Sequence, residues 1–280
     1  MRLSNLLFVI CTSFIFSISY EEGKNILLGI QKNQDSPDTE IKGPVITIVD
    51  GDYVTVKIKS VSLVSSANGP TQLIDSVYAQ FYDNNKPTST LRADFAEYVQ
   101  DDSLIAQNNI SIYNEQTEDL LYFKEQIGSK ISTLWGHDEI KSNDEFIMKT
   151  GDGNNLSGKS FESNMDLTKI KIVGDFIATS YNEDESMNLL KADFAEYSGS
   201  FLIARKNVSI YNLGTKDSLY FINPSTSEIK WFKDDKRIQS NKRFVIKREG
   251  EGCTEGSAFE SNMDLSEMVI KNSKGSSSCE

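Results

Sequence analysis

Apolar and polar residues alternate along much of the chain. In residues 207–212, NVSIYN, Val208 and Ile210 lie on one side and the intervening residues on the other. In residues 91–98, LRADFAEY, the same pattern places Phe95 on a face with Leu and Ala. A period of two is typical of a β-strand with one buried face, so these runs predict strands.

Turn-forming segments separate the apolar runs. Residues 151–155, GDGNN, and 182–184, NED, are examples. Gly, Asn and Asp supply the backbone conformations that tight turns need. No stretch after residue 20 has the pattern of an amphipathic helix. The sequence therefore predicts an all-β, antiparallel fold built from successive hairpins.

Several blocks of sequence occur twice in the same order. LRADFAEY at 91–98 returns as LKADFAEY at 190–197, and NISIYN at 109–114 returns as NVSIYN at 207–212. SFESNMDL also returns as AFESNMDL, and the offset is 98 or 99 residues each time. A fixed period indicates a tandem duplication. We expect two units, 45–168 and 169–275, stacked into an elongated body, with a tail at 276–280.

The first 20 residues differ from the rest. After Arg2 comes an uncharged, largely apolar segment, and polar sequence resumes at residue 21. This pattern is typical of a signal peptide, so we expect an apolar N-terminal helix and export of the remainder. Cleavage after Ser19 and an uncleaved membrane anchor are both open. Residues 21–44 read as a linker.

Composition argues against several functional classes. The chain carries 41 acidic and 29 basic residues, a net charge of −12, and no basic cluster that would favour nucleic-acid binding. The only histidine is His137, and the catalytic, phosphate-binding and zinc-binding motifs are missing. We expect a binding or conduit protein without a cofactor or metal, and not an enzyme. Cys253 and Cys279 either pair or remain separate thiols.

The repeated motifs resemble those of a known family. LxADFAEY, NVSIYN and GSAFESNMDLSEMVIKN together are similar to LptC-like proteins of the periplasmic lipopolysaccharide-transport (Lpt) bridge, whose fold is shared with LptA and the N-terminal domain of LptD. The resemblance implies an open antiparallel OstA-like β-jellyroll with a V-shaped apolar slot for the acyl chains of lipopolysaccharide or a related amphiphile.

The resemblance also implies partners and a location. Rolls of this family join by edge-strand pairing into a bridge from an inner-membrane ABC transporter, through LptA- and LptD-like partners, toward the outer membrane. The chain would then lie in the periplasm, either anchored in the inner membrane or soluble after cleavage. Two units behind a short apolar segment depart from the LptC pattern, so LptC-like and LptA-like roles are both open.

The expected slot would be lined by the inward residues that recur in both units. The alternative is that the same side chains form a packed core, as apolar strand faces usually do. The chain would then be a structural or interaction β-repeat protein of the cell envelope, with no lipid ligand. The expected slot residues are Phe95, Ile110, Ile112, Phe146, Met148 and Phe161 in the first unit and Phe194, Val208, Ile210, Phe244, Ile246 and Phe259 in the second.

Overall fold

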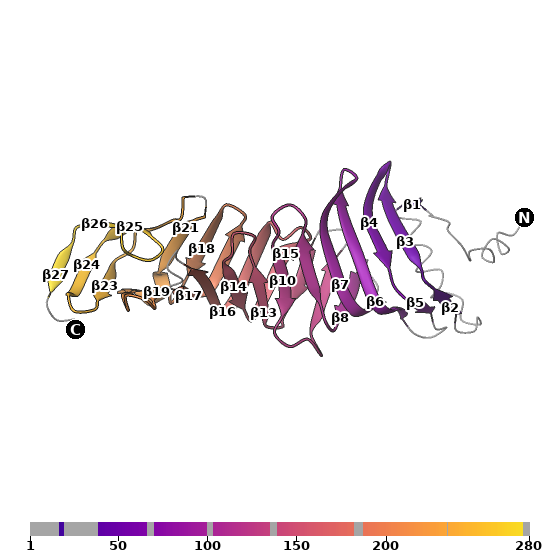
Figure 1. The fold of residues 1–280 in the computed structure, drawn as a ribbon, viewed down its shortest axis with the longest axis horizontal. Coiled ribbons are helices and arrows are strands. Elements are labelled where there is room, and N and C mark those ends of the chain that lie inside the picture. The colour runs from indigo at the N-terminus through magenta and orange to yellow at the C-terminus, as the bar shows by residue number, and fades with distance from the viewer. Residues whose placement is uncertain are drawn as a thin grey trace, which may run out of the picture.

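The computed structural model describes residues 17–19, 39–65, 70–99, 103–134, 139–181, 187–233 and 235–276. The described residues form β-strands and one short 3-10 helix, η2 (Pro224–Thr226), with no α-helix. The expected all-β class is confirmed. The body is elongated, with the chain running from one end to the other (Figure 1).

The strands before the second unit are β1 (Ser17–Ser19), β2 (Thr39–Lys42), β3 (Val45–Asp50), β4 (Tyr53–Lys59), β5 (Ser62–Ser65), β6 (Thr71–Asp83), β7 (Lys86–Val99), β8 (Ser103–Gln107), β9 (Ser111–Asn114), β10 (Leu120–Phe123), β11 (Lys130–Leu134), β12 (Glu139–Ser142), β13 (Phe146–Lys149), β14 (Asn155–Gly158) and β15 (Ser160–Asn164). The later strands are β16 (Lys169–Tyr181), β17 (Met187–Ser198), β18 (Phe201–Arg205), β19 (Ser209–Asn212), β20 (Ser218–Phe221), β21 (Glu228–Phe232), β22 (Arg237–Ser240), β23 (Phe244–Arg248), β24 (Gly252–Gly256), β25 (Ala258–Asn262), β26 (Met268–Lys271) and β27 (Lys274–Ser276).

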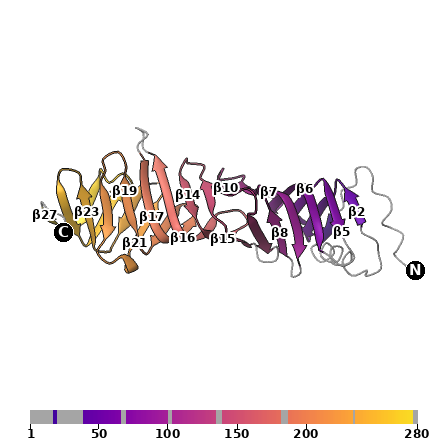
Figure 2. The ribbon, with the colours of Figure 1, turned by 90° about the horizontal axis from the view of Figure 1, so that it is seen from below.

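Four long strands, β6, β7, β16 and β17, connect two facing sheets. For example, one half of β7 pairs with β9 and the other half with β8. In the same way, one half of β16 pairs with β14 and the other half with β15. The ladder β9–β10–β13–β14 continues one sheet, called sheet 1, and β8–β11–β12–β15 continues the other, sheet 2. The strands succeed one another along the long axis in both views (Figures 1 and 2).

Pairing closes on itself in the middle of the molecule. The ten strands from β7 to β16 form a circuit in which every neighbour is antiparallel, so they make a closed barrel, and the remaining strands lie outside it. The expected open jellyroll is therefore wrong, because these ten strands close into a barrel. Closure follows because β7 and β16 are long enough to contribute to both sheets.

The duplication has a strand-by-strand structural counterpart. The ten strands β6–β15 are followed by ten equivalent strands, β16–β25, and matching pairs such as β8–β11 and β18–β21 have matching registers. Strands β2–β5 correspond to the last four strands of a repeat, and β26 and β27 to the two halves of β16. The ten-strand repeat thus starts at β6, whereas the expected first unit started at residue 45.

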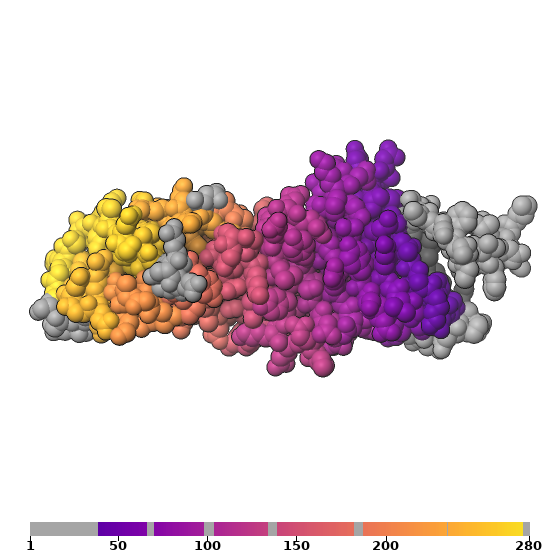
Figure 3. Space-filling model, viewed as in Figure 1, coloured from indigo at the N-terminus to yellow at the C-terminus, as the bar shows by residue number. Residues whose placement is uncertain are grey.

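One apolar core runs through the whole body. Its buried members extend without interruption from Ile48 to Leu265, and the space-filling view shows a continuous elongated body (Figure 3). The outward face of sheet 2 carries ion pairs instead, such as Arg205 with Glu196 and Glu228, both at 2.9 Å. Alternating faces thus separate an apolar interior from a charged exterior, as the period of two predicts.

The N-terminal expectations are only partly covered by the described residues. Ser17–Ser19, the end of the segment expected as a helix, form strand β1, which pairs in parallel with β3. Residues 1–16 lie outside the described residues. The expected linker over 21–44 ends by residue 38, because Thr39–Lys42 form β2 and pair with β5. Among the described residues, no helix is long and apolar enough to cross a membrane.

Candidate functional site: the apolar interior and its mouth

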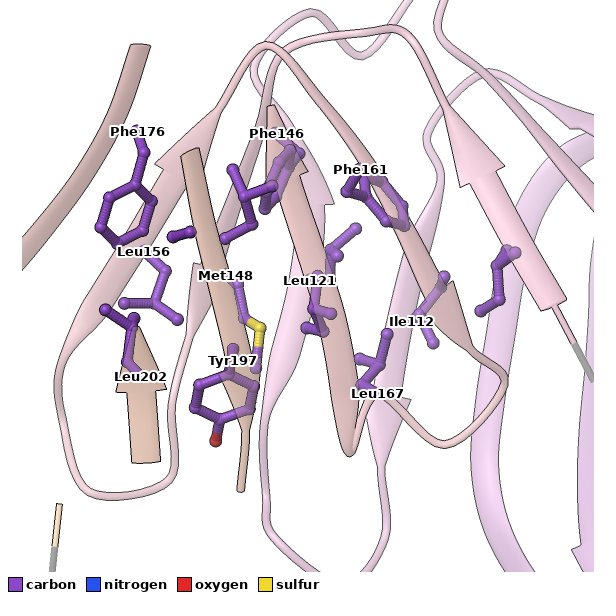
Figure 4. Close-up of a cluster of buried hydrophobic side chains, with 14 of the residues drawn as sticks. Ile112, Leu121, Phe146, Met148, Leu156, Phe161, Leu167, Phe176, Tyr197 and Leu202 are labelled. Atoms are coloured by element: carbon purple, nitrogen blue, oxygen red, sulfur yellow. The ribbon is translucent and has the colours of Figure 1, made fainter. Parts of the chain in front are cut away.

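Ten of the twelve expected slot residues lie in the interior. Each of these ten side chains is at most 4% exposed, and they come from strands β9, β13, β15, β19, β23 and β25 or the residues just before them. Figure 4 shows four of them, Ile112, Phe146, Met148 and Phe161, in one cluster with Leu121. The structure therefore brings these residues together as the alternation predicts.

Aromatic pairs join the two sheets at equivalent places in the two units. The ring of Phe146 in sheet 1 meets that of Phe161 in sheet 2 edge-on, with centroids 4.9 Å apart. Phe244 and Phe259 repeat the contact at 4.8 Å. Edge-to-face geometry is favourable for aromatic rings and adds to their burial. These pairs set the spacing between the sheets.

The other two expected slot residues do not point inward. Phe194 is 38% exposed, with Lys206 4.8 Å above its ring, and Phe95 is half-buried. The placement of these two on the inner face is wrong. The long strand passes from one sheet to the other at Asp193, opposite a bulge in β16, so the alternation restarts one residue later. Ala195 is buried instead.

The side of the roll where the sheets meet, called the spine, is built from main-chain contacts. Most connections between the sheets run there, and Asn207 N–H donates to Pro224 O at 2.8 Å. The repeated motifs meet here too, since Asn109 and Asn207 donate from their side chains to Asp94 and Asp193, at 2.6 and 2.8 Å. The repeated Asp of the octapeptide thus has a structural role.

Two glycines allow the strands to approach closely at the spine. A Cβ added at Gly158 would clash with Ile172, and one at Gly256 would lie 2.5 Å from Ile270 and 2.7 Å from Phe244. Carbon atoms do not approach so closely, because van der Waals contact begins about 3.5 Å apart. Glycine is therefore required before each FESN block by packing.

The opposite side of the roll, called the mouth, is filled by two equivalent turns. The lid turns, residues 165–167 and 263–265, follow β15 and β25. The side chains of Leu167 and Leu265 are completely buried although both residues lie in turns. Both leucines also have a positive φ, 59° and 63°, which a bulky L-residue rarely adopts. Figure 4 shows Leu167 within the interior cluster.

Side chains of sheet 1 hold the lid turns in place. The Asn114 amide donates to Asp166 O, and the Ser89 hydroxyl donates to Met165 O at 2.7 Å. In the second unit Asn212 donates to Asp264 O at 2.9 Å. These contacts close the mouth, so the expected V-shaped slot is not open at either lid turn.

A polar cluster closes the mouth between the two units. Tyr197 O–H donates to Asp119 Oδ2 at 3.1 Å, and Lys233 Nζ donates to the Tyr197 oxygen at 3.0 Å. Lys233 also pairs with Asp152 at 3.3 Å, and Asp119 accepts from Gly151 N–H at 3.0 Å. The acids come from sheet 1 of the first unit and the other two residues from sheet 2 of the second. The cluster therefore couples the units.

The cluster shifts two pKa values in opposite directions. Burial, followed by the nearby Asp119 carboxylate, raises the pKa of Tyr197 above its ordinary value of 10.0. Burial alone would also raise the pKa of Asp152, but hydrogen bonds from Thr150 and the charge of Lys233 outweigh it, and this pKa is lowered. Tyr197 therefore remains neutral and Asp152 charged, which keeps the hydrogen bonds and the ion pair intact.

The indole N–H of Trp231 is one of the buried polar groups for which the described residues supply no hydrogen-bond partner. Trp231 is 5% exposed, and no described residue accepts from its indole N–H. Its neighbours in the ladder, Leu202 and Ile238, are fully buried, so the indole lies on the interior face of the second unit. Buried donors usually find an acceptor, so this group marks a polar point inside an apolar interior.

The remaining candidates for chemistry are sparse in the described part of the chain. No group of His, Cys, Asp and Glu there is placed to hold a metal ion. Cys253 is disulfide-bonded, whereas Cys11, Cys279 and His137 lie outside the described residues.

Sequence reasoning missed the lid turns and the polar cluster. The signal for the lids was present: Met and Leu recur within a turn, NMDL, where polar residues are usual. The cluster had no comparable signal, because Asp119 and Tyr197 are 78 positions apart. No protein-family model and no curated protein sequence matches the chain.

Proposed function

We propose that this chain is a non-enzymatic conduit that carries the acyl chains of an amphiphile through its interior. The observation that supports this most directly is the shape of the apolar core, which is continuous through both units. Main-chain hydrogen bonds close it at the spine, whereas turns and side-chain contacts close it at the mouth. Such an interior could accept hydrocarbon along its length while the polar end of the ligand stays in water.

The strands near the C-terminal end of the described residues support a role in a chain of similar proteins. Within the described residues, β26 pairs only with β25, and β27 only with β24. Their counterpart, β16, has a further neighbour, β17, so the outer edges of β26 and β27 are unpaired among the described strands. Unpaired strand edges are templates for pairing with another chain. The proposed partners are LptA- or LptD-like rolls and an inner-membrane Lpt ABC transporter.

The proposed ligand and location follow from the motif resemblance. Lipopolysaccharide or a related glycolipid has the several acyl chains that a long apolar interior would suit. The proposed location is the periplasm, with the N-terminal segment either retained as an anchor or removed. LptC-like and LptA-like positions in the bridge are both compatible with this proposal.

A second candidate function is favoured by one observation. Ten of the twelve expected slot residues are at most 4% exposed, as in a packed core. A packed core of this kind would be sufficient for a structural or interaction β-repeat protein of the envelope. The two functions differ in whether hydrocarbon ever contacts the interior side chains.

Photocrosslinking in living cells tests the proposal. A small aliphatic diazirine amino acid at Ile112 or Ile210 preserves the size of these fully buried side chains. The same amino acid at Tyr113 or Tyr211, which point outward in the same strands, is the matched control. Lipid adducts at the two inward positions only would support the conduit. A folded, exported protein without such adducts would instead be assigned the structural role.

A further inference from the structure

The lid turns are held differently from the rest of the roll. At the spine, main-chain hydrogen bonds link successive segments, for example from Asn109 N–H to Gln126 O at 2.7 Å. At the mouth, the described contacts between a lid turn and sheet 1 come from side chains, such as Asn212 to Asp264 O and Arg248 to Leu265 O, at 2.9 and 3.4 Å. A few side-chain rotations would therefore release a lid turn without breaking a strand ladder.

The lid turns also carry backbone strain. Leu167 and Leu265 have a positive φ in both units, although their side chains are large. Bulky residues keep this conformation only where their surroundings enforce it. Here the enforcing contacts are the burial of the leucine side chain, the turn's own main-chain hydrogen bond from the leucine N–H, and the hydrogen bonds from sheet 1 to the neighbouring carbonyls. Release of the turn would relieve this strain, which offsets part of the free energy of opening.

The interior offers a place for hydrocarbon when a lid turn leaves. Met263 and Leu265 are 6% and 0% exposed, so their departure would vacate a strip of the core at the mouth. The unpartnered Trp231 N–H lies in the same unit. An amphiphile with an ester, amide or hydroxyl oxygen near its first methylenes could supply the acceptor that the indole lacks.

We propose that the two lid turns are gates, and that an acyl chain enters sideways through the mouth by displacing Met263 and Leu265, or Met165 and Leu167 in the first unit. The proposal rests on the conduit function and adds a route of entry to it. The side chains of the lid turn occupy the acyl-chain site until the ligand arrives. Trp231 then donates to an oxygen of the ligand.

The test uses the full-length chain with Trp135→Phe, which leaves Trp231 as the only tryptophan. The probe is cis-parinaric acid, a fluorescent fatty acid that accepts excitation energy from tryptophan. The variant Asn212→Cys/Asp264→Cys places thiols on the two sides of the mouth, and mass spectrometry verifies the crosslink. The matched control, Asp193→Cys/Asn207→Cys, makes a crosslink on the spine. The parent chain passes through the same oxidation and reduction.

A second variant loosens the lid turn without a crosslink. Asn212 Oδ1 accepts from Gly214 and Thr215 N–H, while its amide nitrogen donates to Asp264 O. Asn212→Asp keeps the acceptor and removes the donor, so the β19–β20 turn remains capped while the lid turn is released. Asn207→Asp removes the corresponding side-chain donor at the spine, where the partner is the Asp193 carboxylate, and is its control.

The expected result is specific to the mouth. The oxidised mouth crosslink should slow energy transfer to the probe at least tenfold. Reduction should raise the rate to that of the parent or above it, because the reduced variant lacks the Asn212 donor, and Asn212→Asp should accelerate energy transfer several-fold. Both spine variants should behave as the parent. If the probe enters the mouth-locked protein and Asn212→Asp as fast as the parent, the gate is overturned while the conduit stands. If no folded variant takes up the probe, the conduit itself falls.

Discussion

The substitution Tyr197→Phe isolates the polar cluster that couples the two units. It removes one oxygen and leaves the ring, which is 3% exposed, in place. Asp119 then loses the donor to Oδ2, and Lys233 loses the acceptor at 3.0 Å. Asp119 retains only the Gly151 N–H among its described side-chain hydrogen bonds. The substitution therefore removes hydrogen bonds to two charged groups, Asp119 and Lys233, and both charged groups remain in the protein.

The expected loss of stability follows from these contacts. Hydrogen bonds to charged groups contribute roughly 1.5–3 kcal/mol each, and a buried carboxylate that loses a partner is not rehydrated. Lys233 keeps its ion pair with Asp152, so most of the loss comes from the hydrogen bond to Asp119. We expect Tyr197→Phe to lower the free energy of unfolding by about 2 kcal/mol at neutral pH. For a chain of this size, that corresponds to a decrease in Tm of roughly 4–8 °C.

The pH dependence gives a second, more specific signature. Because the pKa of Tyr197 is raised in the folded state, its contribution to stability is fully present below the ordinary value of 10.0 and is lost as the pH rises above it. The unfolded chain then releases a proton that the folded chain retains. This single proton adds a slope of about −1.4 kcal/mol per pH unit to the wild-type stability. The stability of Tyr197→Phe should lack this additional slope with pH.

Urea unfolding followed by circular dichroism between pH 7 and pH 11 measures both effects. The other tyrosines and lysines titrate in both proteins. Their contributions therefore cancel in the difference between the unfolding free energies of wild type and variant. Tyr211→Phe, whose ring lies on the outer face, is the control and should stay within about 0.5 kcal/mol of wild type. An unchanged neutral stability together with an unchanged alkaline slope would refute a coupling role for the cluster.

Two further predictions concern the packing between the sheets. Gly158→Ala should lower the free energy of unfolding by about 1–3 kcal/mol, because the new methyl group would clash with the buried Ile172. Gly275→Ala, in strand β27, is the control, because nothing lies within 4 Å of the added Cβ and its φ is not positive. Thermal unfolding compares the two variants, and equal Tm losses would contradict the packing explanation. Phe161→Ala should cost about 3–5 kcal/mol through the cavity it leaves. Chemical denaturation measures this, and a loss below 1 kcal/mol would indicate a loosely filled interior.

The duplicated blocks by themselves predicted the repeat and most of the inner face. The alternation in NVSIYN is a local property, because successive side chains of any strand point to opposite sides. Val208 and Ile210 are therefore buried, while Tyr211 is 37% exposed. The same local rule failed at Phe194, because the strand changes sheets there. That change depends on which strands pair on either side, and alternation within one segment does not contain it.

The role of the repeated asparagines also depended on distant residues. The sequence shows that NISIYN and NVSIYN both end in Asn, but it does not show that Asn114 and Asn212 each contact a turn 52 positions later. The same holds for Asp94, whose partner Asn109 is 15 positions away. These contacts form only once both sheets are assembled in register.

The amino-acid sequence alone determined the all-β class, the tandem duplication and the ten interior positions, because each is encoded by local periodicity or by direct repetition. Only the tertiary structure decided that the roll closes, that Leu167 and Leu265 fill its mouth, and that Asp119 and Tyr197 couple the units. These features depend on the register between strands far apart in the chain. Register is set by packing of the whole interior, to which every strand contributes at once.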